Sequence, residues 1–232
     1  MPSDKALAAR VQSILDELAA KGDPVNVEGM ARFGIVAKKV FGVGMTALRP
    51  IARREGRDPE LAAALWDSGW HESRVLACFV ADPKRFTATE AERWMREFDN
   101  WAVCDAACFH LFDKTPWAYA KARVWSRRKR EFERRAGFAL MASLAVHDKK
   151  AGDEAFLPFL EDIERAADDE RNFVKKAVNW ALRQIGKRNS KLREKAVESA
   201  ERIRAMDSKA ARWIASDALR EFQKVAARFH PR

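Results

Sequence analysis

The chain has 232 residues, of which 47% are apolar and 34% are charged. This balance is typical of a folded protein and excludes a disordered one, and no apolar run approaches the roughly 20 residues that a membrane-spanning helix needs. A formal net charge of +10 favours a polyanionic partner.

The first segment, residues 1–22, reads MPSDKALAARVQSILDELAAKG, with acidic residues among its apolar ones. This pattern predicts an amphipathic helix and not a signal peptide. The cysteines are Cys78, Cys104 and Cys108, and an odd number of thiols gives no disulfide framework. We therefore expect a cytoplasmic protein.

An apolar period of 3.6 residues runs through almost every later segment. Short connections force neighbouring helices to be antiparallel, and the helix pairs recur about every 35 to 40 residues, which is typical of HEAT-like repeats. We predict an all-α fold, a curved α-solenoid of HEAT-like antiparallel helix pairs with a basic concave face. No linker rich in Gly, Ser or Pro divides the sequence, so residues 1–232 are expected to form one domain. The predicted helices cover residues 3–21, 27–41, 45–56, 58–68, 71–82, 88–98, 100–113, 116–126, 130–148, 154–168, 171–187, 190–205 and 208–228.

The seventh predicted helix contains an unusual pair of side chains. Residues 98–113 read FDNWAVCDAACFHLFD, so that Trp101 and Asp105 lie one turn apart on the same face. A solvated face explains the carboxylate but not the tryptophan. A core face explains the tryptophan but makes the carboxylate costly to bury.

Charge is segmental in the second half of the chain. Residues 121–135 carry eight basic and two acidic side chains, and residues 171–195 carry nine basic and one acidic. Residues 153–170, between them, carry eight acidic and one basic. Neighbouring helices are thus expected to present one face to a polyanion and another away from it. The alternative, ordinary solvated helix faces, stays open.

Two further features lie in these basic stretches. Lys176, Arg183 and Lys187 fall on the helical stripe of Trp180, and a tryptophan inside a basic stripe is poorly explained as core. In the segment FERRAGFAL, Arg134 and Arg135 directly precede small and apolar residues, so one of them must turn toward a buried or groove-lining face.

Three segments, NWAVCDAACFHLF, FERRAGFALMASLA and NFVKKAVNWALRQIGK, resemble in order and spacing the AlkD-type DNA glycosylases, the HEAT-like repeat family of DNA alkylation repair enzymes. The resemblance extends more weakly to residues 39–78, KVFGVGMTALRPIARREGRDPELAAALWDSGWHESRVLAC, and so covers most of residues 25–190. It implies removal of 3-alkylated and 7-alkylated purines from double-stranded DNA, without conventional base flipping. It places the family's catalytic Asp at Asp105 and its cleft-lining residues at Trp101, Arg135 and Trp180.

The chemistry of such purines agrees with these roles. The alkylated base is already cationic and leaves easily, so that a carboxylate is needed mainly to stabilise the developing sugar cation, and tryptophan faces attract positive charge. No cofactor is needed. The expected partner is double-stranded DNA containing alkylated purines, with no membrane and no obligate protein partner, and we expect a monomer that is nucleoid-associated when bound to DNA. The residues predicted to bind DNA are Lys121, Arg127, Arg128, Arg134, Lys175, Lys176, Arg183 and Lys187.

Other interpretations remain. The chain could be a catalytically silent relative that binds damaged or branched DNA, or a HEAT-type protein-interaction scaffold, although the second leaves the Trp101 and Asp105 pair unexplained. Cys104, Cys108 and His110 are an incomplete set for tetrahedral zinc, and the cysteines are better explained as small core residues. His71 is expected to be a cap or surface residue.

Overall fold

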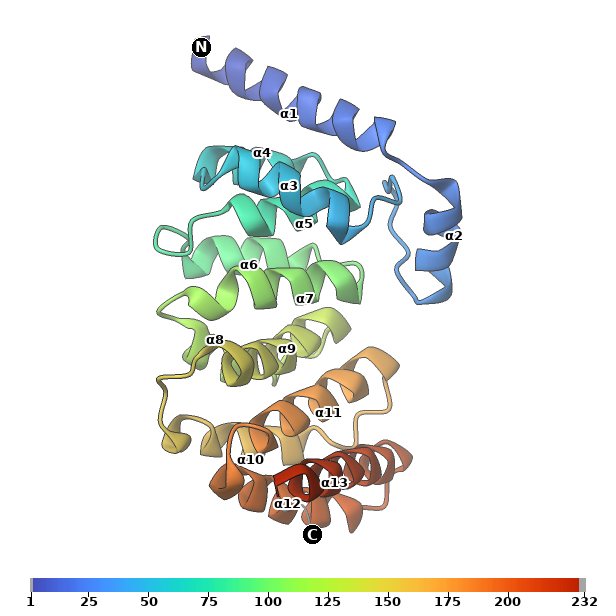
Figure 1. Cartoon of the computed structure of the whole chain (residues 1–232), viewed down its shortest axis with the longest axis vertical. Coiled ribbons are helices and arrows are strands. Elements are labelled where there is room, and N and C mark those ends of the chain that lie inside the picture. Colours follow the sequence, from blue (N-terminus) through green and yellow to red (C-terminus); the bar gives the residue numbers. More distant parts are fainter. Residues whose placement is uncertain (1, 230–232) are drawn as a thin grey trace. The chain divides into compact units, whose positions relative to one another are not determined.

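The computed structural model describes residues 2–229. In this range the chain is all-α, with thirteen α-helices, two short 3-10 helices and no strand (Figure 1). None of the described helices is both long and apolar enough to cross a membrane. The α-helices are α1 Pro2–Ala20, α2 Pro24–Arg32, α3 Met45–Glu55, α4 Pro59–Asp67, α5 His71–Val80, α6 Ala88–Arg96, α7 Trp101–His110, α8 Ala118–Trp125, α9 Glu131–His147, α10 Leu157–Arg165, α11 Asn172–Gly186, α12 Ser190–Arg204 and α13 Lys209–Phe229.

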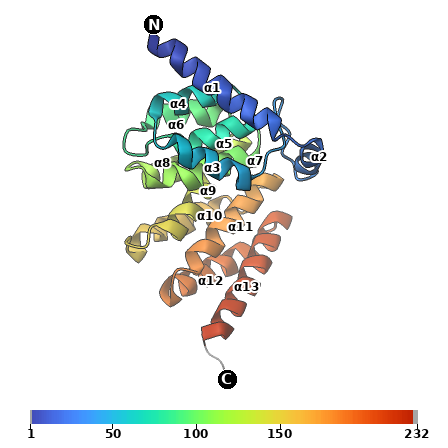
Figure 2. The ribbon, with the colours of Figure 1, turned by 45° about the horizontal axis from the view of Figure 1, so that its top comes forward.

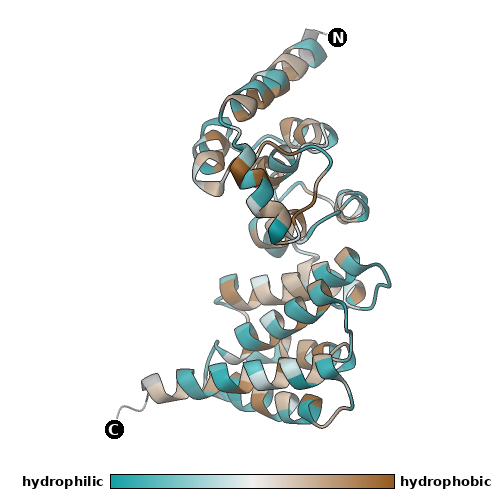
Figure 3. Cartoon of the chain, turned by 90° about the vertical axis from the view of Figure 1, so that its right-hand side faces the viewer, coloured by the Kyte–Doolittle hydropathy of each residue, from teal (hydrophilic) through white to brown (hydrophobic). Residues whose placement is uncertain are grey.

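The chain divides into two compact units, unit 1 (Met1–Thr115) and unit 2 (Pro116–Arg232). Each unit is built of amphipathic helices, and Figure 3 shows hydrophilic and hydrophobic residues alternating along the same helices. The boundary follows Thr115, where the sequence has the helix-ending dipeptide Thr-Pro. That the whole chain acts as one domain stays a prediction.

In unit 1, α3, α5 and α7 lie side by side, and α4 packs against α5 (Figure 1). Figures 1 and 2 both show α2 beside this group of helices. Stacked indole rings fill the core, with the centroids of Trp66 and Trp94 4.1 Å apart. Capping residues set the helix starts. Asp58 accepts a hydrogen bond from the main-chain N–H of Leu61 at the start of α4, and Thr87 forms a capping box with Glu90 at the start of α6.

One predicted helix, 27–41, is wrong. Helix α2 ends at Arg32, and residues 33–44 form an irregular segment with positive φ at Gly34 and Gly42. The fully buried carboxylate of Glu72 accepts hydrogen bonds from the main-chain N–H groups of residues 41–43, the shortest from Gly42 at 2.7 Å. A Cβ at Gly42 would lie 2.3 Å from the carbonyl oxygen of Asp23, so glycine is required there. Tertiary contacts therefore override the helical pattern.

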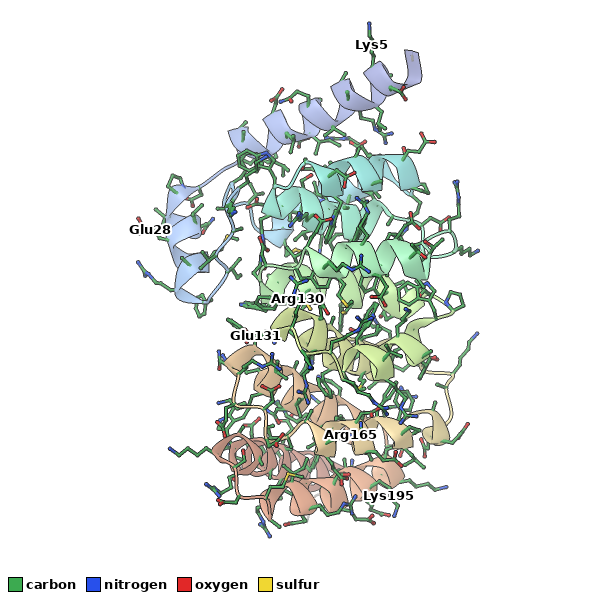
Figure 4. The ribbon with its side chains drawn as sticks, turned by 180° about the vertical axis from the view of Figure 1, so that it is seen from behind. Lys5, Glu28, Arg130, Glu131, Arg165 and Lys195 are labelled. Atoms are coloured by element: carbon green, nitrogen blue, oxygen red, sulfur yellow. The ribbon has the colours of Figure 1, made fainter. Side chains whose placement is uncertain are left out.

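In unit 2, α9, α11 and α13 form one layer, and α8, α10 and α12 lie behind it (Figure 1). Helix α9 is buried along most of its length, from Arg135 to Ala145. Gly137 allows α8 to approach it closely, since a Cβ there would lie 2.2 Å from the main-chain N of Ser126. The acidic segment is also partly buried: Asp162 is 1% exposed and pairs with Arg123, Arg127 and Arg165, the last labelled in Figure 4.

Candidate active site and nucleic-acid interface

Asn100 fixes the start of α7. Its side-chain oxygen accepts hydrogen bonds from the main-chain N–H groups of Ala102 and Val103, at 3.0 and 3.2 Å. The helix then buries one face, which carries Val103, Cys104, Ala107 and Cys108. Trp101 and Asp105 lie on the other face and are both half-buried. This position between core and solvent explains how one face carries an indole ring and a carboxylate.

The indole of Trp101 is anchored by the irregular segment that the sequence predicted as helix. Its Nε1 donates to the carbonyl oxygen of Phe33 at 2.9 Å, while the side chain of Phe33 itself is exposed. Trp101 lines a hollow of about 430 Å³ together with residues of α2 and the segment after it, namely Asn26, Gly29, Met30, Phe33, Ile35, Gly42, Val43 and Gly44. The tryptophan therefore has one edge fixed to the main chain.

A buried histidine supports the helix start. His71 is 7% exposed, and its Nδ1 lies 3.4 Å from Nδ2 of Asn100, which also donates to Asp99 at 2.7 Å. Since an amide nitrogen is a donor, Nδ1 of His71 is the acceptor and the ring is neutral. Burial lowers the pKa of His71 from its ordinary value, which agrees with a neutral ring. The prediction that His71 is a cap or surface residue is therefore wrong, since the N-cap of α5 is Trp70 and His71 is buried.

The cysteines next to Asp105 are not placed for thiolate chemistry. Cys78, Cys104 and Cys108 are buried free thiols. Burial raises the pKa of Cys108, and the negative charges of Asp105 and Asp113 raise it further, so the thiol stays protonated. Among the described residues, no group of three or more His, Cys, Asp or Glu side chains is arranged to hold a metal ion.

In unit 2, Arg135 is the buried member of the arginine pair. It is 6% exposed, and its Nη1 donates to the carbonyl oxygen of Phe173, in the first turn of α11, at 2.6 Å. Arg134 is half-buried and pairs with Asp169 at 3.2 Å. Burial opposes ionisation of Asp169, but hydrogen bonds from Arg171 and the charge of Arg134 outweigh it and lower the pKa of this carboxyl.

On α11, Trp180 is half-buried and Lys176 is exposed. Arg183 and Lys187 have acidic partners that sequence reasoning missed. Arg183 pairs with Asp217 and Glu221 of α13, at 3.1 and 3.3 Å, and Lys187 pairs with Glu221 at 3.4 Å. No local pattern links these residues, because the partners lie more than 30 positions apart in the sequence.

The other predicted DNA-binding residues are dispersed over unit 2. A hollow of about 520 Å³ is lined by the predicted residues Arg127 and Arg128 together with Arg123 and Val124. Lys175 places its Nζ 5.3 Å from the ring centroid of Trp213, and Lys121 is half-buried on α8.

The candidate site is thus distributed between the units. Trp101 and Asp105 belong to unit 1, whereas Arg135, Trp180 and all the predicted DNA-binding residues belong to unit 2. The structure describes each group inside its own unit. That the two groups meet in one cleft stays a prediction.

Comparisons with known proteins extend these observations. The family model described as DNA alkylation repair enzyme matches residues 14–222. A solved structure described as a new family of proteins related to the HEAT-like repeat DNA glycosylases, with affinity for branched DNA structures, is 23% identical, covers 90% of this chain and 94% of its own, and has a TM-score of 0.75. At this identity the likeness shows the fold alone, and the predicted all-α HEAT-like fold is confirmed.

A designed armadillo repeat protein in complex with the peptide (KR)4 is more distantly similar. It is 14% identical, covers 76% of this chain and 92% of its own, and has a TM-score of 0.39, too low to define a common fold. No curated protein sequence matches the chain.

Proposed function

The chain belongs to the DNA alkylation repair enzyme family, and from that premise we propose that it is a DNA glycosylase. Its substrates are cationic alkylated purines in double-stranded DNA, of the 3-methyladenine and 7-methylguanine type. In this proposal the catalytic group consists of Asp105, Trp101, Arg135 and Trp180. The observation that supports it best is the position of Asp105, one turn after Trp101, on the half-buried face of α7.

The proposed reaction begins at the glycosidic bond. As the bond between C1′ and the purine nitrogen breaks, its electron pair leaves with the base and neutralises the base's positive charge. The sugar becomes an oxocarbenium-like cation, which the carboxylate of Asp105 stabilises. Water then attacks C1′ and gives its proton to Asp105. The products are a free alkylated base and an abasic site.

The aromatic and basic residues have different tasks in this proposal. The faces of Trp101 and Trp180 attract a cationic base at roughly 0.5 to 2 kcal/mol each, which favours the lesion over a neutral purine. The buried guanidinium of Arg135, already oriented by Phe173, would contact a phosphate near the lesion. The eight basic residues predicted from the sequence would hold the backbone, and Lys176 is one of those that are exposed.

The decisive experiment is release of a methylated base from duplex DNA in single turnover. We expect wild-type protein to release 7-methylguanine and Asp105→Asn to fold and bind DNA but lose about a hundredfold or more of the rate, because the amide keeps the size of the side chain and loses its charge. Asp67→Asn, the same change at an exposed residue of α4, is the control and should release base like the wild type. Equal rates in Asp105→Asn and wild type would remove Asp105 from the mechanism.

A second candidate function is binding of branched DNA without base release. It is favoured by the fold shared with the proteins related to HEAT-like repeat DNA glycosylases that are described as having affinity for branched DNA. A preference for four-way junctions over duplex of equal length, with no release by the wild-type protein, would support this function over the first.

A further inference from the structure

A row of arginines on unit 1 has no role in the proposed reaction. Arg49 and Arg53 lie one turn apart on α3, and Arg57 follows directly after the helix end, at the same interval of four residues. All three are exposed. We propose that this arginine ridge (Arg49, Arg53 and Arg57) is a phosphodiester-binding subsite that holds the DNA backbone on unit 1, an inference that rests on the proposed function in DNA.

The neighbouring Arg54 has acidic partners, whereas the arginines of the ridge have none among the described residues. Arg54 pairs with Glu17 and with Glu55, both at 2.8 Å. In the part of the chain that the structure describes, Arg49 and Arg53 make no ion pair. Like charges one turn apart on a helix repel each other. The ridge therefore carries positive charge that the protein itself does not compensate and that an external anion can.

The ridge borders an open hollow of about 580 Å³. The small residues Ala52 and Gly56 line it between the arginines, and the ring of Phe79 from α5 lines it as well. Gly56 has a φ of +69°, which favours glycine, and a Cβ there would meet no atom within 4 Å. A ligand can thus approach the main chain of α3 between the guanidinium groups.

Arg57 is oriented at this hollow before any ligand binds. Its Nη1 donates to the carbonyl oxygens of Phe79, at 2.6 Å, and of Ala81. A guanidinium has five N–H donors, so this anchoring leaves donors for an anion. The ring of Phe79 stacks on His110 at a centroid distance of 4.2 Å. His110 ends α7, so the ridge adjoins the helix that carries Asp105.

A phosphodiester backbone fits these features better than a single small anion. One helical turn separates Arg49 from Arg53 by about 6 Å along the axis, which presents donors in sequence to phosphates along one strand. Arginine offers planar, paired donors that suit phosphate oxygens. Contacts to phosphate oxygens fix the position of the duplex and carry no sequence information, so the subsite would position the DNA and not recognise the lesion.

The test compares two double variants in which two basic residues one turn apart become glutamine. Arg49→Gln with Arg53→Gln removes ridge charge. Lys191→Gln with Lys195→Gln removes equal charge from two exposed positions of α12, of which Lys195 is labelled in Figure 4. Affinity for undamaged duplex is measured against salt concentration. Two lost phosphate contacts should reduce the log-log slope by about 1.8 and the affinity at 0.1 M salt on the order of 60-fold. The α12 variant should show neither change.

Three outcomes would overturn the subsite. The first is an unchanged salt slope in the ridge variant, and the second is an equal loss of duplex affinity in the ridge and α12 variants. The third is a ridge variant that binds duplex like the wild type but no longer binds polyglutamate, which would assign the ridge to an acidic peptide. Thermal unfolding checks that both variants fold. Base release at saturating protein separates this inference from the proposed function, because the ridge variant should keep the wild-type chemical rate. If the wild-type protein releases no base, the proposed reaction is wrong. The salt slopes of the two variants still show whether the ridge binds phosphates, because they are measured on undamaged duplex.

Discussion

At the scale of single residues, Trp101 and Asp105 owe their placement to main-chain contacts. Asn100 caps α7 and fixes where the two side chains emerge, and the carbonyl oxygen of Phe33 holds the indole N–H of Trp101. A ring fixed at one edge loses little further rotational freedom when it meets a ligand. The polar groups around this pair thus act by orientation more than by chemistry.

Trp180 offers a test of the aromatic part of the proposal. We expect Trp180→Leu to slow release of cationic 7-methylguanine while leaving affinity for undamaged duplex nearly unchanged, because leucine offers apolar area without the quadrupole of the indole. Base release and thermal unfolding are measured on the same variant. If Trp180 is mainly a core residue, the substitution will instead cost about 2 to 5 kcal/mol of stability and lower every activity together.

His71 predicts a pH dependence of stability. Burial lowers its pKa below the ordinary 6.5, against the charges of Glu72 and Asp99 and with the help of Arg74. Just below pH 6.5 the histidine of the unfolded chain binds a proton, whereas His71 of the folded chain does not. The free energy of unfolding is therefore intact above pH 6.5 and falls as the pH drops below 6.5. Unfolding midpoints between about pH 7.5 and 5.5 should fall more steeply for wild type than for His71→Gln. Parallel curves would contradict this.

At the scale of elements, the buried carboxylate of Glu72 organises the segment of residues 33–44. Glu72→Gln should destabilise the protein by about 1 to 2 kcal/mol, because hydrogen bonds to a charged acceptor are stronger than those to a neutral one. Amide hydrogen exchange at Phe41, Gly42 and Val43 should accelerate. Glu28→Gln, at the exposed residue of α2 labelled in Figure 4, is the control. Unchanged exchange at the three amides would show that the glycines alone shape the segment.

The contrast between α7 and the segment of residues 33–44 shows what sequence can predict. The 3.6-residue period and the Asn cap are local, so α7 and the shared face of Trp101 and Asp105 could be predicted within a few residues. The end of α2 depends on Glu72, far along the chain, and a helical apolar pattern says nothing about it. The partners of Arg183 on α13 were missed for the same reason.

At the scale of the whole molecule, the net charge of +10 overstates the charge available to DNA. Arg127, Arg134, Arg183 and Lys187 already contact carboxylates, and a phosphate must replace or share those partners. Lys176 is exposed, so it is the cleaner probe of phosphate binding on α11.

We expect Lys176→Glu to weaken binding of damaged and undamaged duplex by the same factor, since phosphate contacts carry position and not lesion identity. Its log-log salt slope should fall by about 0.9 or more, because reversal of the charge removes one contact and repels the backbone. Filter binding or fluorescence anisotropy on both duplexes measures this. A selective loss for the damaged duplex would place Lys176 at the lesion instead.

The division into two compact units changes how DNA acts on stability. A ligand that binds only the folded form raises the free energy of unfolding by about 2.7 kcal/mol at a hundredfold excess over its Kd. A duplex held by α11 alone stabilises unit 2 and leaves unit 1 to unfold as before. A duplex held also by the arginine ridge of α3 links the two unfolding equilibria, because unfolding of either unit removes part of the contacts that hold the DNA on the protein.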